Sequence, residues 1–114
     1  MLMTIAAALT AATILAPPAK ADSPTDAIDT KCGVVAMWGE TFQRMNQSGT
    51  SMADALASAV RMAEPDPEIA PVLRAIAITA YANMPRYPTL EFQDRAVADF
   101  RDGLRAECLT NFRG

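Results

Sequence analysis

The sequence predicts an all-α protein: one compact domain of four helices, preceded by a signal peptide, with the first and last helices joined by a disulfide. Three observations support this fold class. Apolar residues recur every three or four positions through most of the 114 residues, and no segment alternates as a half-buried strand would. Proline and glycine stand where that spacing is interrupted. The two cysteines, Cys32 and Cys108, lie in the first and last periodic segments.

Residues 1–21 are predicted to be a secretory signal peptide. The run Ile5–Ala16 is uninterrupted Ile, Ala, Leu and Thr, two prolines end it, and Ala19-Lys20-Ala21 has the small residues that a signal peptidase needs. The run is shorter than the roughly 20 apolar residues of a membrane span, which disfavours an anchor. A genuine first helix is the other alternative. No Lys or Arg precedes the run, which a start site assigned too far downstream would explain. We therefore expect export to the periplasm, cleavage after Ala21 and a single domain over 22–114.

The first helix is predicted over about 26–47. One apolar face collects residues at helical spacing: Ile28, Cys32, Val35, Gly39, Phe42 and Met45. Gly33 and Gly39 are unfavourable inside a helix, so we expect a neighbouring helix to approach closely there. Glu40 and Arg44 are spaced to form an ion pair on the exposed side.

The second and third helices are predicted over about 52–63 and 68–84. Gly49 is placed to end the first helix, Ser51 to cap the second, and Asp66 with Pro67 to start the third. We expect the second helix to place its apolar residues inward: Met52, Ala55, Leu56, Ala59, Val60 and Ala63. The third is the most hydrophobic stretch after the leader, so we expect it to be central and to contact the other three helices.

The last helix is predicted over 89–112, with Thr89 as its cap. Its apolar residues recur every four positions: Phe92, Ala96, Phe100, Leu104 and Cys108. In an exported chain with two cysteines, only the intramolecular pair Cys32–Cys108 is available. Closing a loop of roughly 75 residues contributes about 4 kcal/mol in the chain-entropy account. The alternative is two buried free thiols that pack as small hydrophobes.

Several classes of function are disfavoured by what the sequence lacks. There is no histidine, no CxxC pair, no glycine-rich phosphate loop and no EF-hand spacing. Asp99 and Asp102 are neighbours on the last helix, but arginines surround them, so a solvated ion-paired face is the better interpretation. The chain after residue 21 carries a net charge of −4, which argues against nucleic acid or an anionic membrane surface as partner. We expect no enzyme activity, no catalytic residue, no cofactor, no metal site and no stable membrane insertion after cleavage.

Three residues are candidates for binding a partner protein: Trp38, Arg86 and Tyr87. Trp38 is the single tryptophan and lies beside the apolar face of the first helix. Arg86-Tyr87 lies between Pro85 and Pro88. Trp, Tyr and Arg dominate binding hot spots. The alternative is structural: Trp38 packs at a helix–helix margin, and Arg86-Tyr87 is a stiff connection whose tyrosine folds onto the core.

The pattern resembles a group of uncharacterised small exported proteobacterial helical proteins with one cysteine pair. The residues that carry the resemblance are the first-helix cysteine, the segment 49–55 that opens the second helix, the segment 76–81 and the terminal stretch from Phe100 to Cys108. The group supplies no catalytic residues. Looser likenesses are to the periplasmic acid-stress chaperones of the HdeA type and to periplasmic immunity proteins, which are also small, helical and disulfide-tied.

Together these observations predict a non-enzymatic periplasmic protein that acts by protein–protein binding, as an inhibitor- or immunity-like module with an unknown partner. That class predicts an exposed patch containing Trp38 or Tyr87. A stress chaperone is the alternative, and it predicts partial unfolding on acidification and suppression of client aggregation. An enzyme would need a pocket with paired carboxylates, which the sequence does not indicate.

Overall fold

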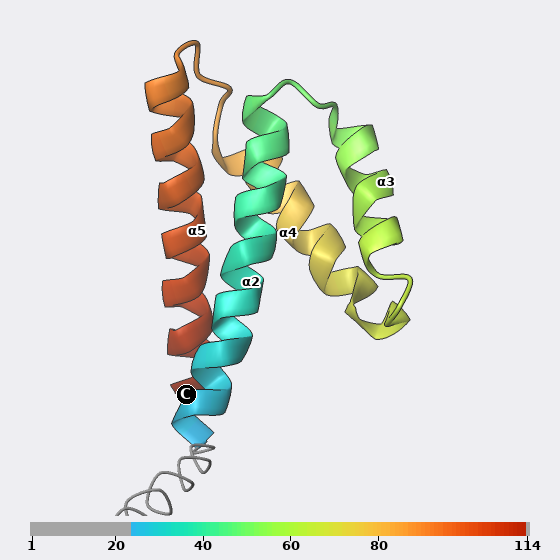
Figure 1. Ribbon diagram of the computed structural model, residues 1–114, viewed down its shortest axis with the longest axis vertical. Helices are drawn as coiled ribbons and strands as arrows, with labels where there is room; N and C mark the ends of the chain where they lie inside the picture. Colours follow the sequence, from blue (N-terminus) through green and yellow to red (C-terminus); the bar gives the residue numbers. More distant parts are fainter. Residues whose placement is uncertain (1–23, 114) are drawn as a thin grey trace, which may run out of the picture.

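The computed structural model describes residues 24–113, which form four α-helices and one short 3₁₀ turn (Figure 1). The helices are α2 (Pro24–Gln47), α3 (Met52–Met62), α4 (Ala70–Asn83) and α5 (Leu90–Arg113), with η2 (Pro67–Ile69) leading into α4. The described residues contain no strand, so the all-α prediction is confirmed. The predicted signal peptide and its cleavage site lie outside the described residues and remain predictions.

The helices are arranged as two pairs that share α2. Helix α5 runs antiparallel to α2 and lies beside it along most of its length, while α3 and α4 form a second pair on the other side (Figure 1). Helix α4 meets α2 near the C-terminal end of both helices and diverges from it toward η2 (Figure 1). The bundle is therefore closed at one end and open at the other.

Helix α2, rather than α4, is the central helix, and this corrects the expectation from hydrophobicity. Helix α2 contacts α5, α4 and α3, whereas α4 contacts α2 and α3 and has at most a marginal contact with α5. Two apolar residues of α4, Val72 and Ile78, remain exposed. A helix that is apolar all round need not be covered on every side when its neighbours are few and short.

The main core lies where α2, α3 and α4 converge, and Phe100 of α5 completes it. Phe42 and Leu73 are its largest fully buried apolar side chains. Helix α3 contributes a stripe of alanines to this core: Ala55 and Ala59, with Ala63 just beyond its end. Because the small residues make the contact, Met52 and Val60 of the predicted inner face are exposed instead.

The predicted helix ends are confirmed by their caps. Gly49 has a φ of +89°, which a glycine adopts without strain. The Ser51 side chain accepts a hydrogen bond from the Asp54 N–H at 3.1 Å, and the Thr89 hydroxyl accepts one from the Phe92 N–H at 3.3 Å. Asp66 caps the 3₁₀ turn η2 that begins at Pro67, whereas the α-helix that was expected to follow this cap directly begins at Ala70. These local signals fix the three connections between the helices before any packing is considered.

Gly39 lies at the closest approach of α2 and α5. A Cβ at this position would collide with the Leu104 side chain and stand 3.3 Å from Cε2 of Phe100. The predicted close approach is therefore confirmed at Gly39. It is wrong at Gly33, where nothing lies within 4 Å of an added Cβ.

The surface ion pairs of α2 cross to α5, so the predicted pairing of Glu40 with Arg44 along the helix is wrong. Arg44 pairs with Asp94 at 2.6 Å, and Glu40 pairs with Arg101 at 3.8 Å. All four side chains are substantially exposed, so each pair contributes at most about 1 kcal/mol. Their main effect is to set the register of α5 on α2.

The disulfide between Cys32 and Cys108 closes the other end of the same helix pair. The two Cα atoms are 5.6 Å apart and the sulfur atoms are 2.08 Å apart, within the range of a disulfide. Cys32 is fully buried. The predicted tie between first and last helices is confirmed, and it holds the N-terminal part of α2 against the C-terminal part of α5.

Gly39→Ala is expected to destabilise the protein by about 1–3 kcal/mol, because the added methyl group must displace Leu104 or push α5 away from α2. Gly33→Ala is the matched control, since it introduces the same group into open space and should stabilise the helix by up to about 1 kcal/mol. Urea denaturation of the two variants checks this. Equal effects of both substitutions would contradict the packing described for Gly39.

Reduction of the exported protein is expected to increase the mass of the monomer by that of two hydrogen atoms. The variant Cys32→Ala/Cys108→Ala should lose about 2–5 kcal/mol of stability, because the long loop is no longer closed in the unfolded chain. Intact-mass spectrometry with and without reductant tests the pairing, and a mass that starts at Asp22 would test the predicted cleavage. Free thiols in protein taken from the periplasm would contradict the disulfide.

Candidate functional site

Side-chain amides of α2 hold the C-terminal end of α4. The Gln43 amide, which is fully buried, donates from Nε2 to the carbonyl of Ala80 at 2.8 Å. Asn46 donates from Nδ2 to the carbonyl of Met84 at 2.9 Å. The last carbonyls of a helix have no partner within the helix, so these bonds complete the end of α4 with donors from α2.

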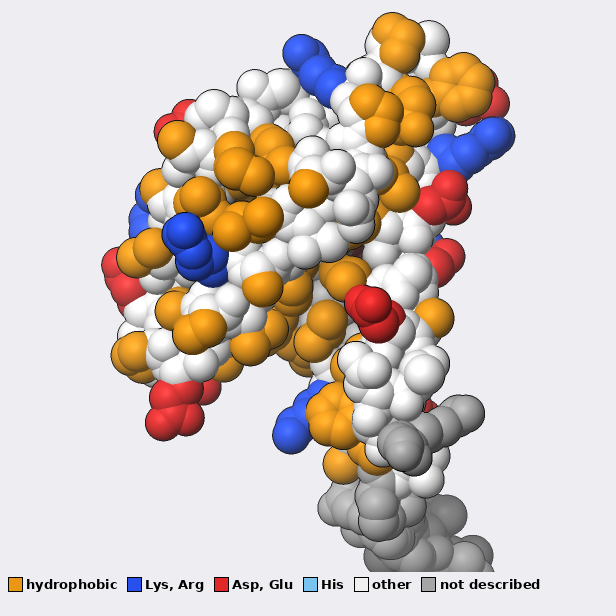
Figure 2. Space-filling view, turned by 180° about the vertical axis from the view of Figure 1, so that it is seen from behind, with side chains coloured by type: hydrophobic (Ala, Val, Ile, Leu, Met, Phe, Trp, Pro, Cys, Tyr) orange, Lys and Arg blue, Asp and Glu red, His pale blue; other side chains and the backbone are white. Residues whose placement is uncertain are grey.

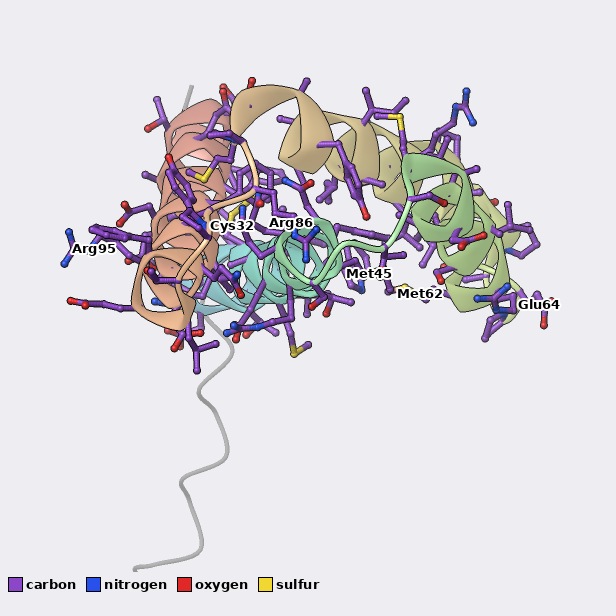
Figure 3. The ribbon with its side chains drawn as sticks, turned by 90° about the horizontal axis from the view of Figure 1, so that it is seen from above. Cys32, Met45, Met62, Glu64, Arg86 and Arg95 are labelled. Atoms are coloured by element: carbon purple, nitrogen blue, oxygen red, sulfur yellow. A yellow bond between two sulfur atoms is a disulfide. The ribbon has the colours of Figure 1, made fainter. Side chains whose placement is uncertain are left out.

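Gln47 extends the same network to the connection between α4 and α5. Its Nε2 donates to the carbonyl of Pro85 at 2.8 Å, and its Oε1 accepts from the Tyr87 N–H at 2.9 Å. The Arg86 Nε donates to the backbone carbonyl of Gln47 at 3.1 Å, and Figure 3 shows Arg86 over the end of α2. Gln93 donates to the carbonyl of Tyr87 at 2.8 Å. Arg86-Tyr87 is therefore held by hydrogen bonds to the end of α2 and to the first turn of α5.

This amide network is the part of the molecule that the sequence reasoning missed. Gln43 and Gln47 are buried although both are polar, and they follow the apolar face of α2 by one or two positions. A periodicity argument assigns such residues to the exposed side. No buried side-chain nitrogen or oxygen in the described residues lacks a hydrogen-bond partner, so the cost of burying the amides is met.

Tyr87 is part of a cluster at the start of α5, here called the aromatic patch: Tyr87, Phe92 and Arg95. The Tyr87 and Phe92 ring centroids are 6.3 Å apart, and the Arg95 guanidinium lies 5.6 Å from the Phe92 centroid. Leu90 is 69% exposed and Phe92 is 47% exposed. Arg95 points outward from α5 (Figure 3). A hollow of about 260 Å³ lies against this patch, between Tyr87, Phe92 and the side chain of Asp99.

Trp38 lies in a different place, in a groove of about 410 Å³ that opens where α4 diverges from α2. Figure 2 shows hydrophobic side chains in the hollow between the two helix pairs. The residues that line it, here called the apolar groove, come from every helix except α3: Thr30, Lys31, Val34, Val35, Trp38, Ile69, Val72, Cys108 and Phe112. Trp38 is partly buried and packs against the main core from this side.

The structure does not bring the three candidate residues together. Tyr87 contacts Phe92 near the start of α5, whereas Trp38 shares the apolar groove with Cys108 and Phe112 near its end. Arg86 is exposed, yet it is hydrogen-bonded to the end of α2. The two surfaces are thus separated by most of the length of α5.

Three carboxylates of α5 pair with arginines: Glu91, Asp94 and Asp102. Arg101 Nε donates to Asp102 at 2.9 Å, and this hydrogen bond raises the pKa of the guanidinium above its ordinary value. Within residues 24–113, no cluster of three or more His, Cys, Asp or Glu side chains is placed to hold a metal ion. No helix in this range is long and apolar enough to cross a membrane.

Tyr81 contributes a further polar anchor outside both surfaces. Its hydroxyl donates to the carbonyl of Thr50 at 2.7 Å, which ties α4 to the start of α3. Partial burial, with a smaller contribution from Asp54, raises the pKa of Tyr81 above its ordinary value.

Comparisons with known protein families, curated proteins and solved structures find no match for this chain. The resemblance to small exported proteobacterial proteins is therefore still a prediction.

Gln47→Leu is expected to cost about 1–3 kcal/mol, because it leaves the Pro85 carbonyl and the Tyr87 N–H without their buried partners. The Tyr87 amide should also exchange with solvent faster. Ser48→Ala is the control, since this exposed neighbour should change stability by no more than about 0.5 kcal/mol. Chemical denaturation and amide exchange measure both effects. Unchanged protection at Tyr87 in the Gln47 variant would show that the network does not hold the connection.

Proposed function

We propose that the protein is a non-enzymatic periplasmic binding module that recognises a partner protein through the aromatic patch, in the manner of an inhibitor or immunity protein. The observation that carries the proposal is the exposure of Phe92 between Tyr87 and Arg95. Large apolar side chains are costly to leave in water, and aromatic residues with arginine are enriched among binding hot spots.

The rigidity of the patch supports this proposal. Tyr87 is held by Gln47 and Gln93, prolines stand on both sides of Arg86-Tyr87, and the Thr89 cap fixes the first turn of α5. A surface that is already ordered loses little conformational entropy on association, so more of its contact energy appears as affinity.

The disulfide supports the proposed compartment. Such bonds persist in oxidising surroundings and are rare where glutathione keeps thiols reduced. With the predicted signal peptide, the Cys32–Cys108 bond favours a periplasmic protein whose partner is met there or is secreted.

The test is capture of a partner from periplasmic extract, followed by measurement of affinity with both proteins purified. The expected complex is one-to-one, and Phe92→Ser should weaken it by at least about thirtyfold, the loss typical of a hot-spot residue. Val60→Ser is the matched control. It removes an apolar side chain that is 65% exposed on α3, away from the aromatic patch, and should leave affinity unchanged.

Equal losses in the two variants, or no loss in either, would contradict recognition through the aromatic patch. If no saturable complex forms but the protein prevents aggregation of unfolded clients at low pH, the chaperone alternative replaces the binding module.

A further inference from the structure

The apolar groove is the second unassigned surface, and its form differs from that of the aromatic patch. It is concave, and its floor is a stripe of α2 that runs from Thr30 to Trp38, about 12 Å along the helix. Its walls are the start of α4 and the end of α5, where Val72 is 45% exposed and Phe112 is 51% exposed. The groove is thus an open hollow lined with apolar side chains that are exposed to solvent.

The dimensions of the groove favour a slender occupant. A volume of about 410 Å³ lies within the range of small-molecule sites. A partner helix with its side chains is about 10–12 Å wide, so two turns of it occupy roughly 900 Å³, and the groove cannot enclose it. A single extended hydrocarbon chain is narrow enough to lie along α2 between the two walls.

The single charged residue of the groove indicates which head group the hydrocarbon chain carries. Lys31 is the only charged residue among the lining residues, and it lies at the end of the stripe opposite Trp38. It forms no ion pair within the described residues. A solitary ammonium beside an apolar channel complements one anionic head group.

We propose that the apolar groove binds a single-chain amphiphile with a carboxylate head, that is, a free medium-chain fatty acid of about ten carbons, because roughly 10 Å of helix separates Lys31 from Trp38. The carboxylate lies at Lys31, and the chain runs past Val34 and Val35 to the indole of Trp38, with Val72 and Phe112 covering its sides. This site is independent of the aromatic patch and of the proposed partner protein.

Trp38 is the only tryptophan of the chain, so its fluorescence reports the site directly. The protein, purified after expression of the full chain, is titrated with 10-bromodecanoate below its micelle concentration, because bromine quenches an indole only at contact. The expected result is saturable one-to-one quenching. Decanoate itself should shift the emission to the blue and compete.

Variants separate the head-group site from the channel. Lys31→Met should weaken binding about fivefold, as expected for one exposed ion pair, and Lys31→Arg should restore it. Val72→Asp should weaken binding at least about tenfold, because its carboxylate costs desolvation beside the chain and repels the ligand head. Val60→Asp makes the same change at an exposed position of α3 outside the groove and should bind as the wild type does. Circular dichroism confirms that each variant is folded.

Three results would overturn the proposal: quenching that does not saturate, a Lys31→Met variant that binds as tightly as the wild type, or Val72→Asp and Val60→Asp with equal effects. Decanoyl lysophospholipid and decanol complete the test. If either binds as tightly as decanoate, the carboxylate is not recognised and the assignment of a fatty acid is wrong.

Discussion

The amide network at the C-terminal end of α2 is the interaction on which the rest of the arrangement depends. Gln43 and Asn46 bind the last carbonyls of α4, and Gln47 binds the connection that follows. Helix α4 is therefore fastened to α2 at this end, and it diverges from α2 toward η2 (Figure 1). One network thus accounts for two features: the rigid presentation of Tyr87 at the closed end and the apolar groove at the open end.

The contact between α2 and α5 is fixed by different means at three levels along its length. Ion pairs that include Arg44–Asp94 cross it near the closed end, Gly39 admits Leu104 in the middle, and the disulfide joins Cys32 to Cys108 near the open end. A domain of this size buries a modest core, so the covalent tie contributes a large share of its stability. The tie also places Cys108 and Phe112 as one wall of the apolar groove.

The two surfaces differ in the chemistry that they suit. The aromatic patch is exposed, carries arginine and is held by hydrogen bonds, which fits recognition of another protein. The apolar groove is concave, almost wholly apolar and bears one lysine, which fits a small amphiphile. Because they are separated by most of α5, occupation of one does not obstruct the other, and the protein has room for both activities.

The sequence by itself determined the helices, their caps and the disulfide. Periodicity, Gly49, Ser51 and Thr89 act through local backbone chemistry, and two cysteines permit one intramolecular pair. Tertiary structure alone decided which helix is central and that Gln43 and Gln47 are buried. It also decided that Glu40 and Arg44 each form an ion pair with a residue of α5 rather than with each other. It also separated Trp38 from Tyr87. The physical reason is that local signals specify where a helix begins and ends, whereas the burial of an amide or the exposure of Phe92 depends on which neighbour reaches it.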